Sequence, residues 1–256
     1  MLKMLETNKV LIQGILNVTP DSFSDGGLYI DIDQAIEHAK KMVADGADII
    51  DIGGESSRPG AEPVSLEEEL HRVMPVVRRL IDEVNVPISI DTYKPKVAEA
   101  CLQAGVHMIN DIQGLRNPAM IKVISQYNIP AIIMHMPGTP QTMQQYVHYN
   151  DVVSEVKEYL RTRAEEAYAR GITDIIIDPG LGFGKTPEQN YEILLRLAEC
   201  KELGYPILIG PSRKSFQGEQ RLNTLEALAL GVKNGAAIVR VHDAAAVKKY
   251  LEHNFK

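Results

Sequence analysis

The stretch VLIQGILNVTPDSFSDGG, residues 10–27, contains the pattern that decides the fold. Its first nine residues are rich in Val, Ile and Leu, which is typical of a buried strand. The strand becomes polar at Asn17 and Thr19, and a loop with the carboxylates of Asp21 and Asp25 follows. An apolar strand, a polar strand end, a loop and a helix then recur in this order along the chain.

Further apolar segments have the length of strands, and helical patterns separate them. These segments are residues 48–53, 87–92, 108–112, 131–136, 174–178, 206–210 and 236–241. Ser65, Thr186 and Asn223 are each followed three residues later by Glu or Gln, which matches the capping box that begins helices. Asn117 precedes Pro118, a favourable first helical residue. Segments 65–84 and 151–170 are amphipathic, as outer helices are.

Eight apolar strands, each followed by a helix, predict a single-domain α/β fold, a (β/α)8 TIM barrel over residues 1–256. The alternative is an open doubly wound sheet. No glycine-rich dinucleotide turn follows the first strand, and the strand count is that of the closed barrel. The sequence therefore favours the barrel.

Composition excludes several classes of partner. The chain has 256 residues, 45% of them hydrophobic, and a net charge of −7, so we expect neither nucleic acid nor an anionic membrane as a partner. The apolar runs are shorter than the roughly 20 residues of a membrane span. The first ten residues lack the apolar core of a signal peptide, and Cys101 and Cys200 have no disulfide or metal spacing. We therefore expect a cytoplasmic protein.

Polar residues end most of the predicted strands. In a barrel of this kind the carboxyl ends of the strands form the active face, so we expect these side chains to form one ring. An unpaired buried charge is costly, which makes a chance accumulation of ionisable groups there improbable. The ring contains Asn17, Asp51, Glu55, Asp91, Asn110, Asp111, His135, Asp178, Ser212, Arg213, Lys214, Arg240 and His242.

Asp91, Asn110 and Asp178 each stand where an apolar strand ends. Carboxylates can bind adjacent N–H donors of a flat heterocycle, and an amide can bind a mixed donor and acceptor edge. The alternative is that one of these acids caps a helix or pairs with an internal Lys or Arg. For Asp51, inside an apolar strand, and Asp111, on the opposite face from Asn110, we expect structural roles.

Basic residues follow the last two predicted strands. Lys214 lies after the seventh, and Arg240 and His242, two residues apart, project to the same face of the eighth. The loops at these positions commonly hold phosphate in this fold, which predicts a phosphate ester or diphosphate substrate. The alternative is a solvated cluster that pairs with Asp21, Asp25 or Glu55, with His242 a neutral histidine.

Asn17, with Asp21 and Asp25, could help to hold a hydrated Mg²⁺ beside such phosphates, because that ion takes few protein ligands. Turn-forming Asp residues in a glycine-rich loop are the alternative. Three long loops are predicted to act as lids: loop one (residues 19–30), loop two (residues 56–64) and loop five (residues 137–148). The alternative is that they are disordered surface segments.

The segment DPGLGFGKT, residues 178–186, superficially suggests a nucleoside-triphosphate loop. Pro179 stands where that motif requires glycine, so we do not expect Lys185 to bind phosphate. Phe183 either lines an aromatic-substrate slot or plugs the barrel.

Several segments together resemble the dihydropteroate synthase family. They are GILNVTPDSFSDGG, GADIIDIGGESSRPGA, PISIDTYK, NDI, DPGLGFGK, SRKSF and RVHD, in the order of that family and over nearly the whole chain. The resemblance implies a homodimeric barrel enzyme of folate synthesis that joins 6-hydroxymethyl-7,8-dihydropterin diphosphate to 4-aminobenzoate and releases diphosphate.

The resemblance also implies the site residues. The pterin would contact Asp91, Asn110, Asp178 and Lys214, and the diphosphate would contact Asn17, Arg240 and His242 with Mg²⁺. The aminobenzoate slot would use Phe23, Ser57, Pro59, Phe183, Lys214 and Ser215, with Arg58 approaching as loop two closes. Asp91, Lys214, Arg240 and His242 would form the catalytic set.

Two features depart from the family pattern. Ser57 replaces the usual Thr, and the stretch after Phe216 is shorter than usual. Two other functions stay open: a pterin-binding methyltransferase domain, which needs no diphosphate site, and a non-catalytic pterin-binding homologue.

Overall fold

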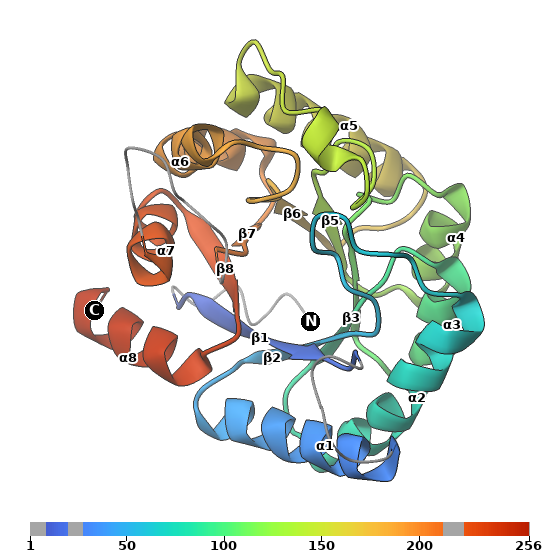
Figure 1. Cartoon of the computed structure of the whole chain (residues 1–256). Helices are drawn as coiled ribbons and strands as arrows, with labels where there is room; N and C mark the ends of the chain where they lie inside the picture. The colour runs from blue at the N-terminus through green and yellow to red at the C-terminus, as the bar shows by residue number, and fades with distance from the viewer. Residues whose placement is uncertain (1–8, 20–27, 212–222, 256) are drawn as a thin grey trace.

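Eight parallel strands form a closed barrel in the computed structural model, which describes residues 9–19, 28–211 and 223–255. Each strand pairs with its sequence neighbour, and β1 closes the barrel against β8. Figure 1 shows the strands at the centre and the helices around them. The strands are β1 (Leu11–Asn17), β2 (Ile49–Gly53), β3 (Ile88–Asp91), β4 (Met108–Asp111), β5 (Ala131–Met134), β6 (Ile175–Asp178), β7 (Ile207–Ile209) and β8 (Ala236–Val241).

A helix follows each strand, as the sequence predicts. The α-helices are α1 (Leu28–Ala44), α2 (Leu66–Glu83), α3 (Pro95–Gln103), α4 (Pro118–Tyr127), α5 (Val152–Ala169), α6 (Pro187–Leu195), α7 (Thr224–Lys233) and α8 (Ala244–Asn254). Two 3₁₀ helices, η3 (Met143–Gln145) and η4 (Leu197–Leu203), lie in the connections before α5 and before β7. The predicted barrel is confirmed, and the predicted strand bounds differ from the observed ones by at most two residues.

The predicted caps also form, with one difference. Thr186 and Asn223 make reciprocal capping boxes, and the Asn117 side chain accepts from the N–H of Ala119. Ser65 accepts from the N–H of Glu68, but the Glu68 carboxylate accepts from Arg72 Nε at 2.7 Å. The prediction of a complete box at Ser65 is therefore wrong in its second half, because Arg72, one turn further along the helix, offers a charged donor.

The barrel interior changes from apolar to polar along the strands. A layer of apolar side chains fills its amino-terminal part: Leu11, Ile49, Met108, Ile132, Ile176, Leu208 and Ile238. Side chains two residues apart in a strand share a face. Gln13, Asp51, Asn110, Asp178 and Arg240 each come two residues after a member of that layer, so they continue the interior toward the carboxyl ends. The larger core lies between the barrel and the helices.

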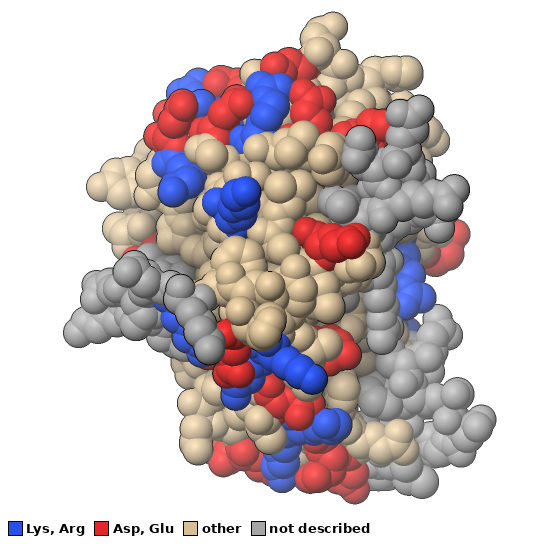
Figure 2. Space-filling view, turned by 90° about the vertical axis from the view of Figure 1, so that its left-hand side faces the viewer, with Lys and Arg blue, Asp and Glu red and all other residues tan. Residues whose placement is uncertain are grey.

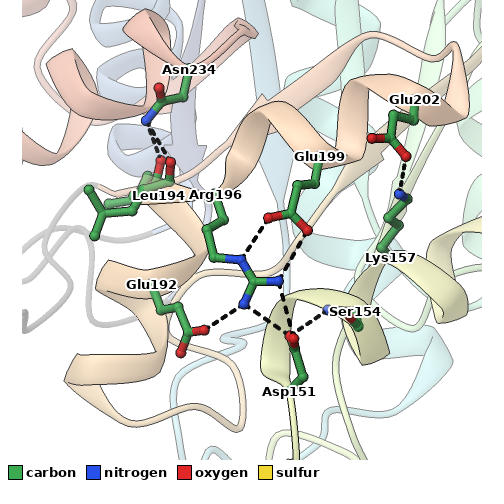
Figure 3. A network of polar contacts seen from close by, with 10 residues as sticks. Asp151, Ser154, Lys157, Glu192, Leu194, Arg196, Glu199, Glu202 and Asn234 are labelled. Atoms are coloured by element: carbon green, nitrogen blue, oxygen red, sulfur yellow. Dashed lines mark hydrogen bonds and ion pairs between the residues drawn. The ribbon is translucent and has the colours of Figure 1, made fainter.

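An ion network joins the outer helices α5, α6 and η4. Figure 3 shows Arg196 at its centre, 2.7 Å from Glu192, 2.7 Å from Glu199 and 3.1 Å from Asp151. Asp151 caps α5, and the backbone N–H of Ser154 together with Arg196 lowers the pKa of Asp151 to about 2. These side chains are partly exposed, so the net contribution of each pair to stability is small.

Cys101 and Cys200 are buried free thiols, and burial raises the pKa of Cys101 to about 12 and that of Cys200 to about 11. Within the described ranges no helix combines the length and the apolar character that crossing a membrane requires.

Candidate active site

Three polar residues lie together at the carboxyl ends of β1, β3 and β4. The strand register places Asn17 beside Gly53, Gly53 beside Asp91, and Asp91 beside Asn110. A Cβ atom at Gly53 would lie 3.6 Å from Asp91 Cβ and 3.8 Å from Asn17 Oδ1. The glycine therefore leaves space between the Asn17 and Asp91 side chains.

Asp178 ends β6 and is buried at the same end of the barrel. Its Oδ1 accepts from the backbone N–H of Gly180 at 2.7 Å, which fixes the carboxylate and the start of the following loop. The structure thus brings Asp91, Asn110 and Asp178 to one face, and their use in binding a heterocycle stays a prediction.

Arg240 lies inside the barrel mouth between two carboxylates. Its Nε donates to Asp51 Oδ2 at 2.6 Å, and one terminal nitrogen donates to Asp91 Oδ2 at 2.7 Å. Arg240 thus pairs with carboxylates, as the alternative interpretation expects of the basic residues, and its partners among the described residues are Asp51 and Asp91. His242 directly follows β8, two residues after Arg240, and is partly buried.

Asp51 connects Arg240 to the barrel interior. Its carboxylate accepts from Ser89 Oγ at 2.5 Å and from Asn110 Nδ2 at 3.1 Å, in addition to Arg240. Gln13 Nε2 donates to Ser89 Oγ at 2.8 Å. The predicted structural role of Asp51 is confirmed, and the same contacts orient Asn110 and Arg240.

Burial raises the pKa of Asp91 to about 7; the guanidinium of Arg240 opposes this shift, and the negative charge of Asp51 adds to it. Asp111, on the other face of β4, accepts from the backbone N–H groups of Gln113 and Leu115 at 2.7 and 3.1 Å. Burial raises its pKa to about 6. The predicted structural role of Asp111 is confirmed, because it closes the turn after β4.

Lys185 lies buried in the loop after β6. Its Nζ is 2.9 Å from His135 Nδ1 and donates to the carbonyl oxygens of Gly180 and Phe183, both at 2.9 Å. Burial, with the nearby charge of Lys185, holds the pKa of His135 well below its usual range. These contacts give Lys185 the role of ordering this loop.

Phe183 is buried against Ile112, Met134, Met136 and Met143, with Tyr93 packed on the same cluster. Loop five, which contains Met143, also holds loop two. The N–H of Gly60 donates to the carbonyl of Pro140, and Gln141 Nε2 donates to the carbonyl of Ala61, both at 3.0 Å. Phe183 therefore packs against the loop that supports Ser57, Arg58 and Pro59.

Some predicted residues lie outside the described ranges: Asp21, Phe23, Asp25, Ser212, Arg213, Lys214 and Ser215. Other residues of the site were missed by sequence reasoning. Gln13 and Ser89 are polar residues in apolar strands. Because inward and outward positions alternate along a strand, their inward orientation could have been predicted from the sequence. Tyr93, Lys94 and Glu69, described below, have no such local signal.

The oxygen atoms at the strand ends are suited to a divalent cation that keeps most of its water ligands, rather than to a metal held by protein ligands alone. In residues 9–19, 28–211 and 223–255, no three His, Cys, Asp or Glu side chains gather in a metal-binding group. Asn17 offers a neutral amide oxygen close to Asp91. Mg²⁺ commonly keeps most of its waters and takes one or two protein oxygens beside phosphate, so Asn17 fits this use.

Comparisons with known proteins show the family to which the chain belongs. A family model described as "Pterin binding enzyme" matches residues 13–242. The dihydropteroate synthase of Synechocystis sp. is 47% identical over 93% of this chain and 87% of its own length.

Two solved structures have the same fold. The dihydropteroate synthase of Xanthomonas albilineans with 4-aminobenzoic acid superposes with a TM-score of 0.89 at 42% identity, covering 96% of this chain and 92% of that one. The Clostridium difficile enzyme in the presence of pteroic acid gives a TM-score of 0.88 at 46% identity, covering 97% and 98%. The chain belongs to the dihydropteroate synthase family of pterin-binding enzymes.

Proposed function

We propose that the chain catalyses the dihydropteroate synthase reaction. It joins 6-hydroxymethyl-7,8-dihydropterin diphosphate to 4-aminobenzoate and releases diphosphate. Family membership supports this function, and so does the arrangement of the strand ends. The observation that carries it is the short distance, 2.7 Å, between Arg240 and Asp91. Arginine side chains bind phosphate well, and a carboxylate can bind the N–H groups of a heterocyclic ring.

Asp91, Asn110 and Asp178 would bind the edge of the pterin, together with Lys214 as the family resemblance implies. Two nitrogens of Arg240 already donate to Asp51 and Asp91. The other N–H groups of its planar guanidinium can donate to phosphate oxygens. Arg240 can therefore hold the diphosphate while the carboxylates hold its orientation, with His242 beside it on the same strand end.

The bond that breaks joins the pterin methylene carbon to the diphosphate oxygen, and its electron pair leaves with diphosphate. Arg240 and His242 would neutralise the leaving group, and the Asp91 carboxylate would stabilise the positive charge that develops on the pterin. The arylamine nitrogen then forms the new bond to the methylene carbon and loses a proton. No covalent intermediate with the protein is required.

Mg²⁺, held by Asn17 and the substrate phosphates, would supply further neutralisation of the diphosphate. The aminobenzoate would lie with loop two, through Ser57 and Pro59, on one side and Phe183, from the loop after β6, on the other. Phe23, Lys214 and Ser215 would complete the slot. Arg58 is exposed and would approach as loop two closes.

We also propose a homodimer and a cytoplasmic location. Figure 2 shows the face that carries α6, α7 and α8 in Figure 1, with charged side chains at its upper and lower parts and a largely uncharged band between them. Leu195, at the end of α6, is 47% exposed. A largely uncharged band on this face and, separately, the exposed Leu195 support association of two copies. The two buried free thiols support a reducing compartment.

The test is a turnover assay. The purified protein, incubated with the pterin diphosphate, 4-aminobenzoate and Mg²⁺, is expected to release diphosphate and form 7,8-dihydropteroate in equal amounts. Binding of the pterin diphosphate without release would instead identify a non-catalytic pterin-binding homologue.

A further inference from the structure

Glu55 joins the two ends of loop two. This residue immediately precedes the loop, and Val64 is the last residue of the loop. One carboxylate oxygen of Glu55, Oε2, accepts from the backbone N–H of Val64 at 3.2 Å. The other, Oε1, accepts from the hydroxyl of Tyr93 at 2.5 Å. The carboxylate thus closes loop two on itself and ties it to the chain that follows β3.

Lys94 strengthens this tie with charge. Its ammonium group pairs with Glu55 and, at 2.5 Å, with Glu69 of α2. The Glu55 side chain is 9% exposed and the Glu69 side chain 1%, so these ion pairs are shielded from solvent. Burial, with the hydrogen bond to Glu55, raises the pKa of Tyr93, which keeps its hydroxyl protonated and donating. Buried charge-assisted contacts of this kind hold a defined geometry.

The same contacts relate loop two to the predicted pterin site. Tyr93 and Lys94 come two and three residues after Asp91. Their side chains reach Glu55, so the position of loop two is defined relative to the end of β3. The tip of loop two has weaker support, because its bonds to loop five involve Gly60 and the exposed side chain of Gln141.

The residues that would hold the pterin do not depend on Glu55. Asp91 and Asn110 are oriented by Arg240 and Asp51, and Asp178 by the backbone of Gly180. Loss of the Glu55 contacts would therefore release loop two and leave the pterin residues in place.

We propose that Glu55, Tyr93 and Lys94, the loop-two junction, are positioning residues that hold Ser57, Arg58 and Pro59 for the amine substrate. The inference rests on the proposed function, because it assigns loop two to the arylamine step. The junction controls where the amine approaches the pterin, whereas binding of the pterin diphosphate is independent of it.

Glu55→Ala is the main test variant. It removes the contacts to Val64, Tyr93 and Lys94 but leaves Lys94 paired with Glu69, so no cation is stranded. The expected result is a rise of about tenfold or more in KM for 4-aminobenzoate, with KM for the pterin diphosphate changed by less than about twofold. Glu62→Ala is the matched control, since Glu62 is an exposed glutamate in the same loop. It should behave as the wild type.

Hydrogen exchange supplies a readout that does not depend on turnover. In Glu55→Ala the amides of residues 56–58 and 60–62 should exchange faster, while those of β3 and β4 keep their wild-type rates. Tyr93→Phe, which removes a single hydrogen bond and keeps the ring, should shift KM for 4-aminobenzoate in the same direction by a smaller factor. Lys94→Arg keeps the charge and should stay within about twofold of the wild type.

Equal rises in both KM values, or no change in either KM value, would overturn the proposal. If Glu55→Ala fails to fold, Glu55→Gln and Tyr93→Phe keep the size of the side chains. The same comparison of the two KM values can then be made with these variants. A wild-type protein that releases no diphosphate would reject the proposed function instead. In that case the exchange rates of residues 56–58 and 60–62 still show whether the junction holds loop two.

Discussion

Arg240 and Asp91 form an ion pair at the mouth of the barrel, with 2.7 Å between a terminal guanidinium nitrogen and Asp91 Oδ2. Asp51, which is fully buried, holds the same guanidinium through Nε at 2.6 Å. Arg240 therefore links an interior carboxylate to one at the rim. This link opposes the effect of burial on the ionisation of Asp91, and the first predictions concern that carboxylate.

Asp91→Asn keeps the shape of the side chain and removes its charge. We expect kcat to fall by about 10²–10³, the range for loss of one group that stabilises a developing charge. Rapid-quench measurement of dihydropteroate formation checks this. Asp82→Asn, at an exposed position of α2, should leave the rate unchanged. Near-normal condensation by Asp91→Asn would refute the assigned role.

The activity should depend on the ionisation of Asp91. Burial raises the pKa of Asp91 to about 7, and the mechanism requires the carboxylate, so kcat/KM should decrease as pH falls below about 7. Because Arg240 opposes the rise in the pKa of Asp91, Arg240→Met should move the acidic fall in kcat/KM to higher pH. A pH profile of kcat/KM for the pterin diphosphate tests both statements. A flat profile between about pH 5 and 8 would contradict them.

The same ionisation affects stability with a defined sign. The folded-state pKa of Asp91 lies above the ordinary value of 3.8, so the folded protein binds this proton more tightly than the unfolded chain. The contribution of Asp91 to the free energy of unfolding is therefore largest at pH values below 3.8 and is lost as pH rises through about 7. Denaturant titrations of wild type and Asp91→Asn should differ in this pH dependence. If the free energy of unfolding changes with pH in the same way in both proteins, the pKa of Asp91 is not raised in the folded state.

Asp51→Ala should destabilise the fold strongly. The variant leaves Arg240 with one of its two carboxylates and removes the acceptor of Ser89 and Asn110. Breaking a buried ion pair costs about 3–5 kcal/mol. Urea unfolding measures this loss, and Asp45→Ala, which removes a surface pair with Lys41, is the control with a much smaller expected change. Equal losses would contradict the view that Asp51 organises the interior.

Magnesium removal should lower turnover if Asn17 helps to hold the ion. Chelation by EDTA is expected to reduce diphosphate release, and added Mg²⁺ to restore it. Asn17→Ala should raise the Mg²⁺ concentration that gives half-maximal rate. An unchanged Mg²⁺ dependence in this variant would show that Asn17 is not a ligand.

The barrel could be predicted because its signals are local. Each strand is an apolar run, and the period of two residues places Asp51, Asn110 and Arg240 on the same side as the apolar layer. The strand ends therefore located the candidate site. Polar residues at inward positions, such as Gln13 and Ser89, follow from the same alternation.

The contacts that organise the site could not be predicted, because they join residues far apart in the chain. Asp51 and Arg240 are 189 residues apart, and Glu55 and Lys94 are 39 apart. In sequence Lys94 resembles any surface lysine before a helix, and only its packing between Glu55 and Glu69 gives it a role. The partner of a buried charge is determined by tertiary packing rather than by local pattern.

The central claim is that carboxylates and an amide at one barrel rim bind a planar ring, while Arg240 and His242 bind its diphosphate. A crystal structure of the wild-type protein with the pterin diphosphate bound tests it most directly. We expect the ring to contact Asp91, Asn110 and Asp178, and the diphosphate to contact Arg240 and His242. A ring distant from Asp91 and Asp178, or a diphosphate distant from Arg240 and His242, would contradict it.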